Sequence, residues 1–537
     1  MKNMNFSLIK GVCLIFVLAL LSACSSTKPL TSPAIQNINE SISKSAALGA
    51  SLEESWSHLD LVNDTIPGVS LDRAYKEIVK EDSKTIIVAV IDSGIDIAHE
   101  DLQENIWINE GEVPNNGIDD DKNGYIDDVN GWNFLGDSTN EQLEYVRLIA
   151  SGDKSNPRFS EAQELHEKEV KKYSSSKDRY EIINNRIKSS DKKIKDFLGK
   201  EKYDKTDVSN ITSDDENILN SVNVIKQAYS FGYNSIDEIT EELDEYIKSL
   251  NDRLNYYLNI DFNGRAVVGD DPNNINDRKY GDNNVMPKNG SSHGTHVSGI
   301  IAATRNNGIG INGAANNVKI MAIRNTPNGD EYDKDVALGV YYAVDNGAKI
   351  INMSFGKSFS PHSDWVRDAI AYAAEKDVLI VAAAGNNAEN TDIVQYYPND
   401  QLGVGDEVSD NFIKVGASTY NFDSSLVSSF SNYGKSSVDL FAPGSRIYST
   451  YPENDYEYAQ GTSMASPLVA GIAALVWSQY PKLSASQLKR VLMASGLKLK
   501  KDISLSDDSK LPFDELSKSG RLVNAYNALI LASKTSK

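Results

Sequence analysis

A continuous run of apolar, mostly β-branched residues at positions 85–91 constrains the fold of this chain more than any other stretch. Its sequence, TIIVAVI, is typical of a strand that is buried on both faces of a parallel sheet. Similar runs follow, with segments of helical pattern between them at 333–346 and 363–376; these runs lie at 318–323, 349–354, 378–383, 412–417 and 438–442. The alternation predicts an α/β fold in which helices flank a doubly wound, mainly parallel sheet.

The composition is that of a soluble globular protein, with 40% hydrophobic and 24% charged residues. The 537 residues are enough for one large core or for two or three domains. Acidic residues outnumber Lys and Arg by 76 to 54, which gives a formal net charge of −22. Because a surface of that sign repels nucleic acid and attracts cations, we expect no nucleic-acid partner.

Both cysteines, Cys13 and Cys24, fall near the N-terminus. Residues 1–23 contain an apolar stretch that is too short to span a bilayer comfortably, and we interpret them as a signal peptide. The sequence LSAC that ends at Cys24 resembles the bacterial lipoprotein signal, in which the cysteine is lipidated and becomes the new N-terminus. A plain secretory signal is the alternative. No other cysteine follows, so disulfides cannot stabilise the mature chain, and bound calcium is one substitute.

The remaining chain divides by composition. Residues 24–55 are rich in Ser, Thr, Asn and Lys, which predicts a flexible N-terminal tether. The alternating pattern occupies 56–136 and 263–533, which we assign to one domain. Residues 137–262 are highly charged and carry apolar residues at helical spacing, so we predict a helical insertion, a hairpin or small bundle. Its charged face is either plain solvated surface or a gate for a substrate.

The clearest helix of this insertion follows Ser235, which forms a capping-box pattern with Glu238. Its apolar residues lie on one stripe that comprises Ile236, Ile239, Leu243, Tyr246, Leu250, Leu254 and Tyr257. A stripe of this kind indicates that one helix face packs against a neighbour.

An acidic loop at 116–128 has the pattern of a calcium site. Oxygen-bearing side chains alternate along it, and a glycine permits a sharp turn, which suits a hard cation that needs six to eight oxygen ligands. The candidate ligands are Asp119, Asp121, Asn123, the carbonyl of Tyr125, and Asp127 or Asp128. The loop lacks the glutamate that closes an EF-hand. A merely solvated acidic loop is the alternative, although crowded carboxylates repel one another without a cation.

Three short motifs carry residues suited to nucleophilic catalysis. Asp92 follows the 85–91 strand, where functional groups collect in open α/β sheets, although an aspartate there can also cap a turn. Ser463 lies between a glycine and an apolar helix, at the positive end of the helix dipole; this position suits a nucleophile and equally an ordinary helix cap. His293 and His296 stand three apart, but no third metal ligand is evident, so a general base fits better than zinc.

Taken together, these motifs resemble the three signatures of the subtilisin-like serine peptidases, in that family's order. They read DSG at 92–94, HGTHV at 293–297 and GTSMASP at 461–467. The resemblance covers roughly residues 56–529 apart from the insertion. The 201-residue interval from Asp92 to His293 is far longer than is usual for the family, and the space before the first strand is too short for a typical pro-domain.

The resemblance implies a role for each matched residue. Ser463 would attack the scissile carbonyl, His293 would remove and return its proton, and Asp92 would orient the imidazole. Asn386, in the sequence AAAGN, matches the family's oxyanion donor, and the backbone N–H of Ser463 would be the second donor. His296 would be structural.

Two further sites follow from the resemblance. The strand ends that would bind an extended substrate are Ser354, Phe355 and Gly356 together with Ala383, Ala384 and Gly385. Their small residues lead us to expect a broad preference for apolar or aromatic substrate side chains. Asp101 matches a calcium ligand of the family, although its partner loop at 304–311 departs from the usual pattern.

We therefore expect a bacterial serine endopeptidase outside the cytoplasm, anchored to the membrane by lipid, stabilised by calcium and monomeric. It would act on protein or peptide substrates, and catalysis would need no cofactor. One alternative is a dedicated processing peptidase for a single partner protein. The other is an inactive relative that binds partners through its helical insertion.

Overall fold

The computed structural model describes residues 30–35, 49–403 and 405–536. The predicted signal peptide and Cys24 lie outside these residues. The chain forms two compact units, which we call the sheet unit (Met1–Phe134, Asn273–Asn325 and Asp333–Lys537) and the helical unit (Leu135–Pro272 and Thr326–Tyr332). Among the described residues, no helix combines the length and apolarity needed to cross a membrane.

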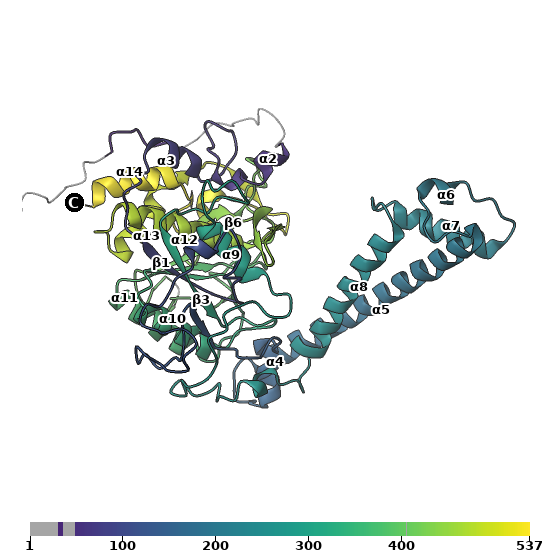
Figure 1. The fold of residues 1–537 in the computed structure, drawn as a ribbon, viewed down its shortest axis with the longest axis horizontal. Coiled ribbons are helices and arrows are strands. Elements are labelled where there is room, and N and C mark those ends of the chain that lie inside the picture. Colours follow the sequence, from purple (N-terminus) through teal and green to yellow (C-terminus); the bar gives the residue numbers. More distant parts are fainter. Residues whose placement is uncertain (1–29, 36–48, 404, 537) are drawn as a thin grey trace, which may run out of the picture. The chain divides into compact units, whose positions relative to one another are not determined.

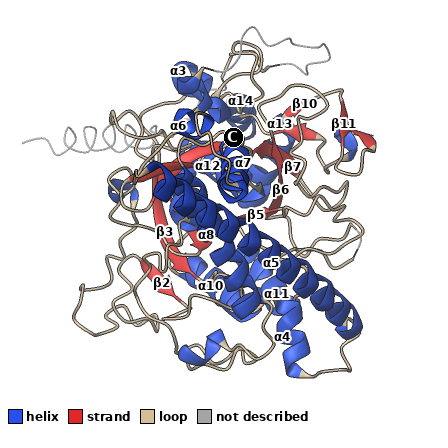
Figure 2. Cartoon of the chain, turned by 90° about the vertical axis from the view of Figure 1, so that its right-hand side faces the viewer, coloured by secondary structure: helices blue, strands red, loops and turns tan. Residues whose placement is uncertain are grey.

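A nine-stranded sheet runs through the described part of the sheet unit in the order β10-β13-β7-β6-β5-β4-β1-β3-β2 (Figures 1 and 2). Neighbouring strands are parallel, apart from β10 and β13. The strands are β1 (Ile86–Asp92), β2 (Gly131–Asn133), β3 (Val318–Arg324), β4 (Ile350–Met353), β5 (Leu379–Ala383), β6 (Phe412–Ser418), β7 (Leu440–Pro443), β10 (Leu497–Lys498) and β13 (Arg521–Leu522). The predicted parallel sheet is confirmed, because each predicted strand becomes one of its central strands.

Helices cover both faces of this sheet. Alternate residues of β1 face different helices. Val88 and Val90 belong to the core that includes α9 and α12. Ile91 faces α10, where its side chain lies 3.4 Å from the place that a β-carbon on Gly339 would take. The helices of this unit are α2 (Ala50–Glu53), α3 (Leu71–Glu77), α9 (His293–Ala302), α10 (Asp333–Asp345), α11 (Ser363–Glu375), α12 (Thr462–Gln479), α13 (Ala485–Ser495) and α14 (Ala525–Thr535). The fold is therefore α/β, as predicted.

Two small hairpins complete the described part of the sheet unit. They are formed by β8 (Ile447–Tyr451) with β9 (Asp455–Ala459), and by β11 (Asp502–Ser504) with β12 (Lys510–Pro512). The first hairpin packs against α9. It therefore supports the helix that carries His293.

The helical unit contains α4 (Glu144–Ser151), α5 (Phe159–Leu198), α6 (Lys205–Ser209), α7 (Glu216–Tyr229) and α8 (Ile236–Asp252). With 40 residues, α5 is about 60 Å long, and α7 and α8 pack along it (Figure 1). The predicted stripe of α8 buries Ile236, Ile239 and Leu250. Ser235 caps α8 through the Glu238 N–H, whereas the Glu238 carboxylate accepts from Asn234 rather than from Ser235.

Candidate active site

The register of the sheet brings three strand ends to one edge. Ile91 of β1 pairs with Met353 of β4, which in turn pairs with Ala382 of β5. The residues that follow, Asp92, Ser354 and Ala383, therefore lie side by side, because parallel strands end at the same edge. Helices α9 and α12, which pack on each other, carry His293 and Ser463.

His293 and Asp92 are in direct contact. Nδ1 of His293, the first residue of α9, lies 2.7 Å from Oδ1 of Asp92, the last residue of β1. The Asp92 side chain is 1% exposed and that of His293 is 38% exposed. With Nδ1 bonded to the carboxylate, Nε2 is left for a reacting group. A Cβ on Gly294 would lie 2.3 Å from the carbonyl oxygen of Gly94, so only glycine lets α9 approach β1 this closely.

The surroundings of His293 raise its pKa above the usual value of 6.5. The protein atoms around the partly exposed ring act in the opposite direction and are the largest influence, because the water they displace would favour the imidazolium. The negative charge of Asp92 and the hydrogen bond to it outweigh this influence together. The pair therefore favours a positive charge on His293, which is what a base that receives a proton requires.

Ser463 exchanges hydrogen bonds with Ser354. The Ser463 hydroxyl donates to the Ser354 carbonyl oxygen at 2.8 Å, and the Ser354 hydroxyl donates to the Ser463 carbonyl oxygen at 2.9 Å. The hydroxyl proton of Ser463 is thus directed at Ser354 in this conformation and not at His293. Hydrogen bonds between a nucleophile and its base often form only when a substrate binds.

Asn386 lies beside the start of α12. Its Oδ1 accepts hydrogen bonds from the backbone N–H of Thr462 at 2.8 Å and from the Thr462 hydroxyl at 3.0 Å, which orients Nδ2. A β-carbon on Gly461 would lie 3.3 Å from Asn386 Nδ2 and 3.5 Å from the backbone nitrogen of Ser463. Two nitrogen atoms that carry N–H donors thus lie close to one point beside Gly461, and two donors so placed can bind an oxyanion.

Sequence reasoning missed Thr462. Its hydroxyl accepts from the Gly385 N–H at 3.0 Å while donating to Asn386, so it ties the end of β5 to α12. A threonine that precedes a serine carries no recognisable signal of that role.

His296 is buried and bonds a different part of the fold from His293. Its Nε2 lies 3.1 Å from the carbonyl oxygens of Ile447 and Glu457, which belong to the β8–β9 hairpin. Burial lowers the pKa of His296 to about 4, the backbone hydrogen bonds only partly oppose this, and a neutral imidazole results. It therefore joins α9 to the hairpin.

The six predicted substrate-binding residues lie at the ends of β4 and β5, next to the site. Ser354, Phe355 and Gly356 follow β4, and Ala383 ends β5 before Ala384 and Gly385. Asn432 fixes the second segment: its Nδ2 donates to the Ala384 carbonyl, and its own backbone N–H donates to the Gly385 carbonyl, both at 2.9 Å.

In the acidic loop, the carboxylates of Glu112, Asp119 and Asp121 converge. One oxygen from each lies within 4.8 Å of the others, and this is the single such group among the residues that the structure describes. Sequence reasoning missed Glu112, which precedes the repeating pattern. Its Oε1 accepts from the backbone N–H groups of Asp120 and Asp121, which shapes the loop.

Like Asp119 and Asp121, the other predicted calcium ligands form hydrogen bonds within the protein. The Asp127 carboxylate accepts from the N–H groups of residues 116 and 117, and the Asn123 amide donates to Asp128. Burial raises the pKa of Asp128, and hydrogen bonds, including one from Tyr342, offset part of the rise. The Tyr125 ring packs edge-on against Trp132, Phe134 and Tyr342.

Asp101 lies apart from that cluster and is fully buried. Its Oδ1 accepts from the Asn307 side chain at 2.7 Å, and its Oδ2 accepts from the Ile311 N–H at 3.1 Å. Both partners belong to the 304–311 loop, so Asp101 organises that loop through hydrogen bonds.

The chain is similar in sequence to known serine proteases. The chain is 41% identical to a thermophilic serine proteinase of Bacillus sp. (strain AK1) over 224 residues, which are 42% of this chain and 50% of that protein. It is 41% identical to thermitase of Thermoactinomyces vulgaris over 41% of this chain and 70% of thermitase. A solved protease structure from Pseudoalteromonas arctica matches over 89% of this chain and 97% of its own, with a TM-score of 0.46 and 20% identity.

The sequence model of the subtilase family matches residues 83–507, well over half of the chain. The matched stretch contains the paired Asp92 and His293 as well as Ser463 and Asn386. It begins just before β1 and includes each strand end at which these residues lie. On the extent of this match, together with the parallel sheet that supports the site, the chain belongs to the subtilase family.

Proposed function

We propose that this protein is a serine-type endopeptidase that hydrolyses peptide bonds through Asp92, His293 and Ser463. The observation that carries the proposal is the 2.7 Å contact between His293 and the buried Asp92 in a member of the subtilase family. Ser463, at the positive end of α12, supplies the nucleophile.

In the proposed reaction, Oγ of Ser463 attacks the scissile carbonyl carbon and its proton passes to Nε2 of His293. Asp92 stabilises the resulting imidazolium. The oxyanion accepts hydrogen bonds from Asn386 Nδ2 and the Ser463 N–H. Cleavage of the C–N bond then leaves an acyl-enzyme on Ser463, and His293 returns the proton to the departing amine. Water, deprotonated by the same base, hydrolyses the ester and regenerates Ser463.

Covalent labelling with a fluorophosphonate tests this proposal. The probe reacts with a serine that has an assembled base and oxyanion site. We expect a single labelled peptide that contains Ser463 in the wild type and no labelling of Ser463→Ala. A folded wild-type protein that does not label would contradict the proposal and would favour a binding protein with a peptidase fold.

Substrate range separates a broad endopeptidase from a dedicated one. The family's catalytic residues match at all four positions, Asp92, His293, Asn386 and Ser463, which argues against an inactive binding protein; the choice between a broad and a dedicated enzyme rests on substrate range, and we propose the broad enzyme. Cleavage of several unrelated unfolded proteins at comparable rates would support it. Cleavage of a single partner, lost when residues 159–252 of the helical unit are replaced by a short linker, would point to a dedicated processing peptidase instead.

We also propose a structural calcium ion at the acidic loop. Glu112, Asp119 and Asp121 would hold it, since carboxylate oxygens that converge within 4.8 Å are the ligands a hard cation prefers. The ion would stabilise the loop by balancing its negative charge. No catalytic step requires it.

The LSAC sequence supports anchoring by lipid at Cys24 and a location outside the cytoplasm. Cys24→Ala should release the protein from membranes. Membrane association that survives this change would contradict the anchor, without bearing on catalysis.

A further inference from the structure

The Tyr396 side chain lies against both substrate-binding segments. A β-carbon on Gly356 would lie 2.5 Å from Cε1 of Tyr396, and a β-carbon on Gly385 would lie 2.7 Å from the same atom. The Cζ atom of Tyr396 would lie 3.1 Å and 2.8 Å from those two positions. The edge of the Tyr396 ring therefore stands between the two strand ends, where a substrate side chain would enter.

The Tyr396 ring is held from its outer end. Its hydroxyl donates to the Gly356 carbonyl oxygen at 2.8 Å, so the ring reaches across to the β4 segment. Tyr396 itself belongs to the connection between β5 and β6. Tyr396 thus links the β5–β6 connection to the segment that follows β4.

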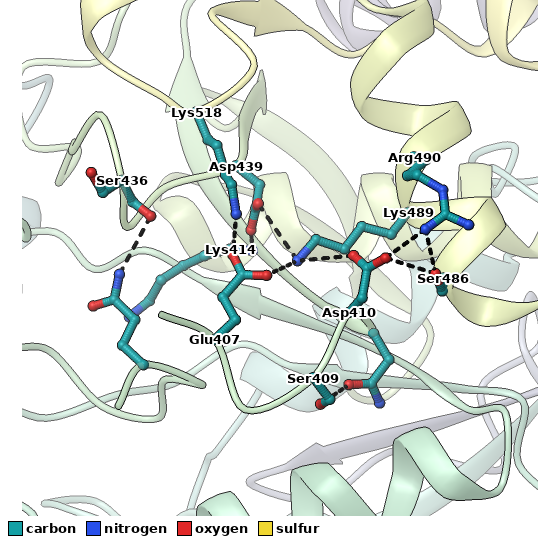
Figure 3. A network of polar contacts seen from close by, with 12 residues as sticks. Glu407, Ser409, Asp410, Lys414, Ser436, Asp439, Ser486, Lys489, Arg490 and Lys518 are labelled. Carbon is teal, nitrogen blue, oxygen red and sulfur yellow. Dashed lines mark hydrogen bonds and ion pairs between the residues drawn. The ribbon is translucent and has the colours of Figure 1, made fainter. Parts of the chain in front are cut away.

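The backbone of Tyr396 is held by a hydrogen bond from a buried lysine. Nζ of Lys414, on β6, donates to the Tyr396 carbonyl oxygen at 2.8 Å, and Lys414 is only 3% exposed. Figure 3 shows Lys414 beside a network in which Glu407 and Asp439 surround Lys489. The backbone N–H of Lys414 donates to Asp439 at 2.8 Å. Lys414, whose backbone is held on β6 by Asp439, thus keeps the Tyr396 segment in place through its side chain.

We propose that Tyr396 closes the lower part of the primary specificity pocket, so that the enzyme cleaves after residues with small side chains, such as glycine, alanine or serine. This inference rests on the proposed peptidase function. It differs from the preference for apolar or aromatic residues expected from the sequence, because that expectation considered only the small residues of the two walls. Tyr396 enters from a third segment and carries no motif.

Because Tyr396 would occupy the pocket, it should strongly affect which residue the enzyme accepts before the scissile bond. A single methylene group in an apolar pocket changes kcat/KM by about 10- to 200-fold. An aromatic ring that cannot enter should cost at least as much. We therefore expect the wild-type enzyme to cleave after alanine about 100-fold faster, in kcat/KM, than after phenylalanine.

The test uses p-nitroanilide peptides that differ only in the residue before the scissile bond: Gly, Ala, Leu or Phe. Wild type, Tyr396→Gly and Tyr396→Phe are compared. Tyr396→Gly should raise kcat/KM for the Phe peptide about 100-fold and change that for the Ala peptide by only a few fold. Tyr396→Phe keeps the ring and should keep the preference for alanine. A matched control is Tyr372→Ala, which removes a tyrosine on α11 that contacts Tyr341.

Two outcomes would overturn the assignment. One is a wild-type enzyme that cleaves after Phe as fast as after Ala; this measurement needs no variant and so does not depend on variant folding. The other is a Tyr396→Gly enzyme with the wild-type ratio. Fluorophosphonate labelling of Ser463 in the same samples separates the two proposals: a protein that labels but shows no such preference contradicts the pocket assignment alone, and one that does not label contradicts both.

Discussion

Gly461 faces the side-chain amide of Asn386, and a β-carbon at Gly461 would lie 3.3 Å from its Nδ2 atom. The same β-carbon would lie 3.5 Å from the backbone nitrogen of Ser463. Gly461 has a φ of +151°, which L side chains rarely adopt. The absence of a side chain at this position therefore leaves open the space next to both proposed oxyanion donors.

Gly461→Ala should reduce turnover by about 10²- to 10³-fold, the loss typical of removing an oxyanion donor. Combined with Asn386→Ala, the two losses should not add, because both changes disable one site. Peptide hydrolysis and a melting curve of each variant check this. Gly403→Ala is the control, since nothing lies within 4 Å of its added carbon. Wild-type turnover in a folded Gly461→Ala enzyme would contradict this assignment.

Ser354→Ala should lower kcat about tenfold with little change in KM. The hydroxyl of Ser354 donates to the Ser463 carbonyl and accepts from Asn352, so its loss loosens the first turn of α12 by about 1 kcal/mol. Ser466→Ala is the matched control. Ser466 lies on α12, like Ser463, and its hydroxyl donates to the side chain of Asn352. It should lower the melting temperature and spare kcat. Equal effects of both changes on kcat would argue against a positioning role for Ser354.

The sheet could be predicted from the sequence because its strands are buried on both faces. Runs such as Ile86–Ile91 then carry a continuous apolar signal, and each predicted strand end agrees with the structure to within two residues. Asp92 and His293 could be selected as candidates because short motifs mark them. Their contact joins residues 201 positions apart, and no local pattern measures that distance.

The supporting residues could not be predicted, for a physical reason. Thr462, Glu112 and Tyr396 act through neighbours brought in by the tertiary fold, and each is an ordinary residue in its own stretch of sequence. Likewise, Asp119, Asp121, Asp127 and Asp128 all have the spacing of calcium ligands, and all accept hydrogen bonds within the loop region, but only Asp119 and Asp121 converge with Glu112. Spacing indicates which atoms can be ligands, but loop closure decides where they point.

The raised pKa of His293 predicts the pH dependence of activity. The base must be neutral to accept a proton, so kcat/KM should rise with pH through the His293 pKa. The midpoint of this acidic limb should lie above 6.5, the usual histidine value. A profile of kcat/KM between pH 5 and 9 on a neutral peptide measures it.

Asp92→Asn tests the cause of that shift. Partial burial of His293 remains and the opposing negative charge is removed, so the acidic limb should move to lower pH. Turnover should fall by about 10⁴-fold, because an amide no longer holds the imidazole in the tautomer that leaves Nε2 free to accept a proton, and the imidazolium is no longer stabilised. An acidic limb that stays in place would show that Asp92 does not set the His293 pKa.

Removal of calcium should lower the melting temperature of the wild type by about 5 °C, because a cation that binds only the folded state stabilises it by mass action. The effect of a chelator should shrink in Glu112→Gln and Asp121→Asn, which remove charges from the converging group. Glu110→Gln makes the same change at an exposed position two residues away and should respond like the wild type. An identical wild-type melting curve with excess chelator would exclude a stabilising calcium ion.

Asp400 makes the stability of the sheet unit depend on pH. Burial, with a further contribution from nearby Asp439, raises the Asp400 pKa from 3.8 to about 7, although Lys489 opposes the shift. The folded protein therefore binds the Asp400 proton more tightly than the unfolded chain does. The neutral carboxyl contributes its full stability below pH 3.8, and this contribution is lost as the pH rises through 7.

Asp400→Asn keeps the neutral form at every pH. Its free energy of unfolding, relative to the wild type, should therefore increase by about 2 kcal/mol between pH 5 and pH 8. Urea unfolding at the two pH values measures this difference, in which the other titrating groups largely cancel. A constant difference for Asp400→Asn would mean that Asp400 is already ionised at pH 5 in the folded protein, with the cations around it compensating for its burial.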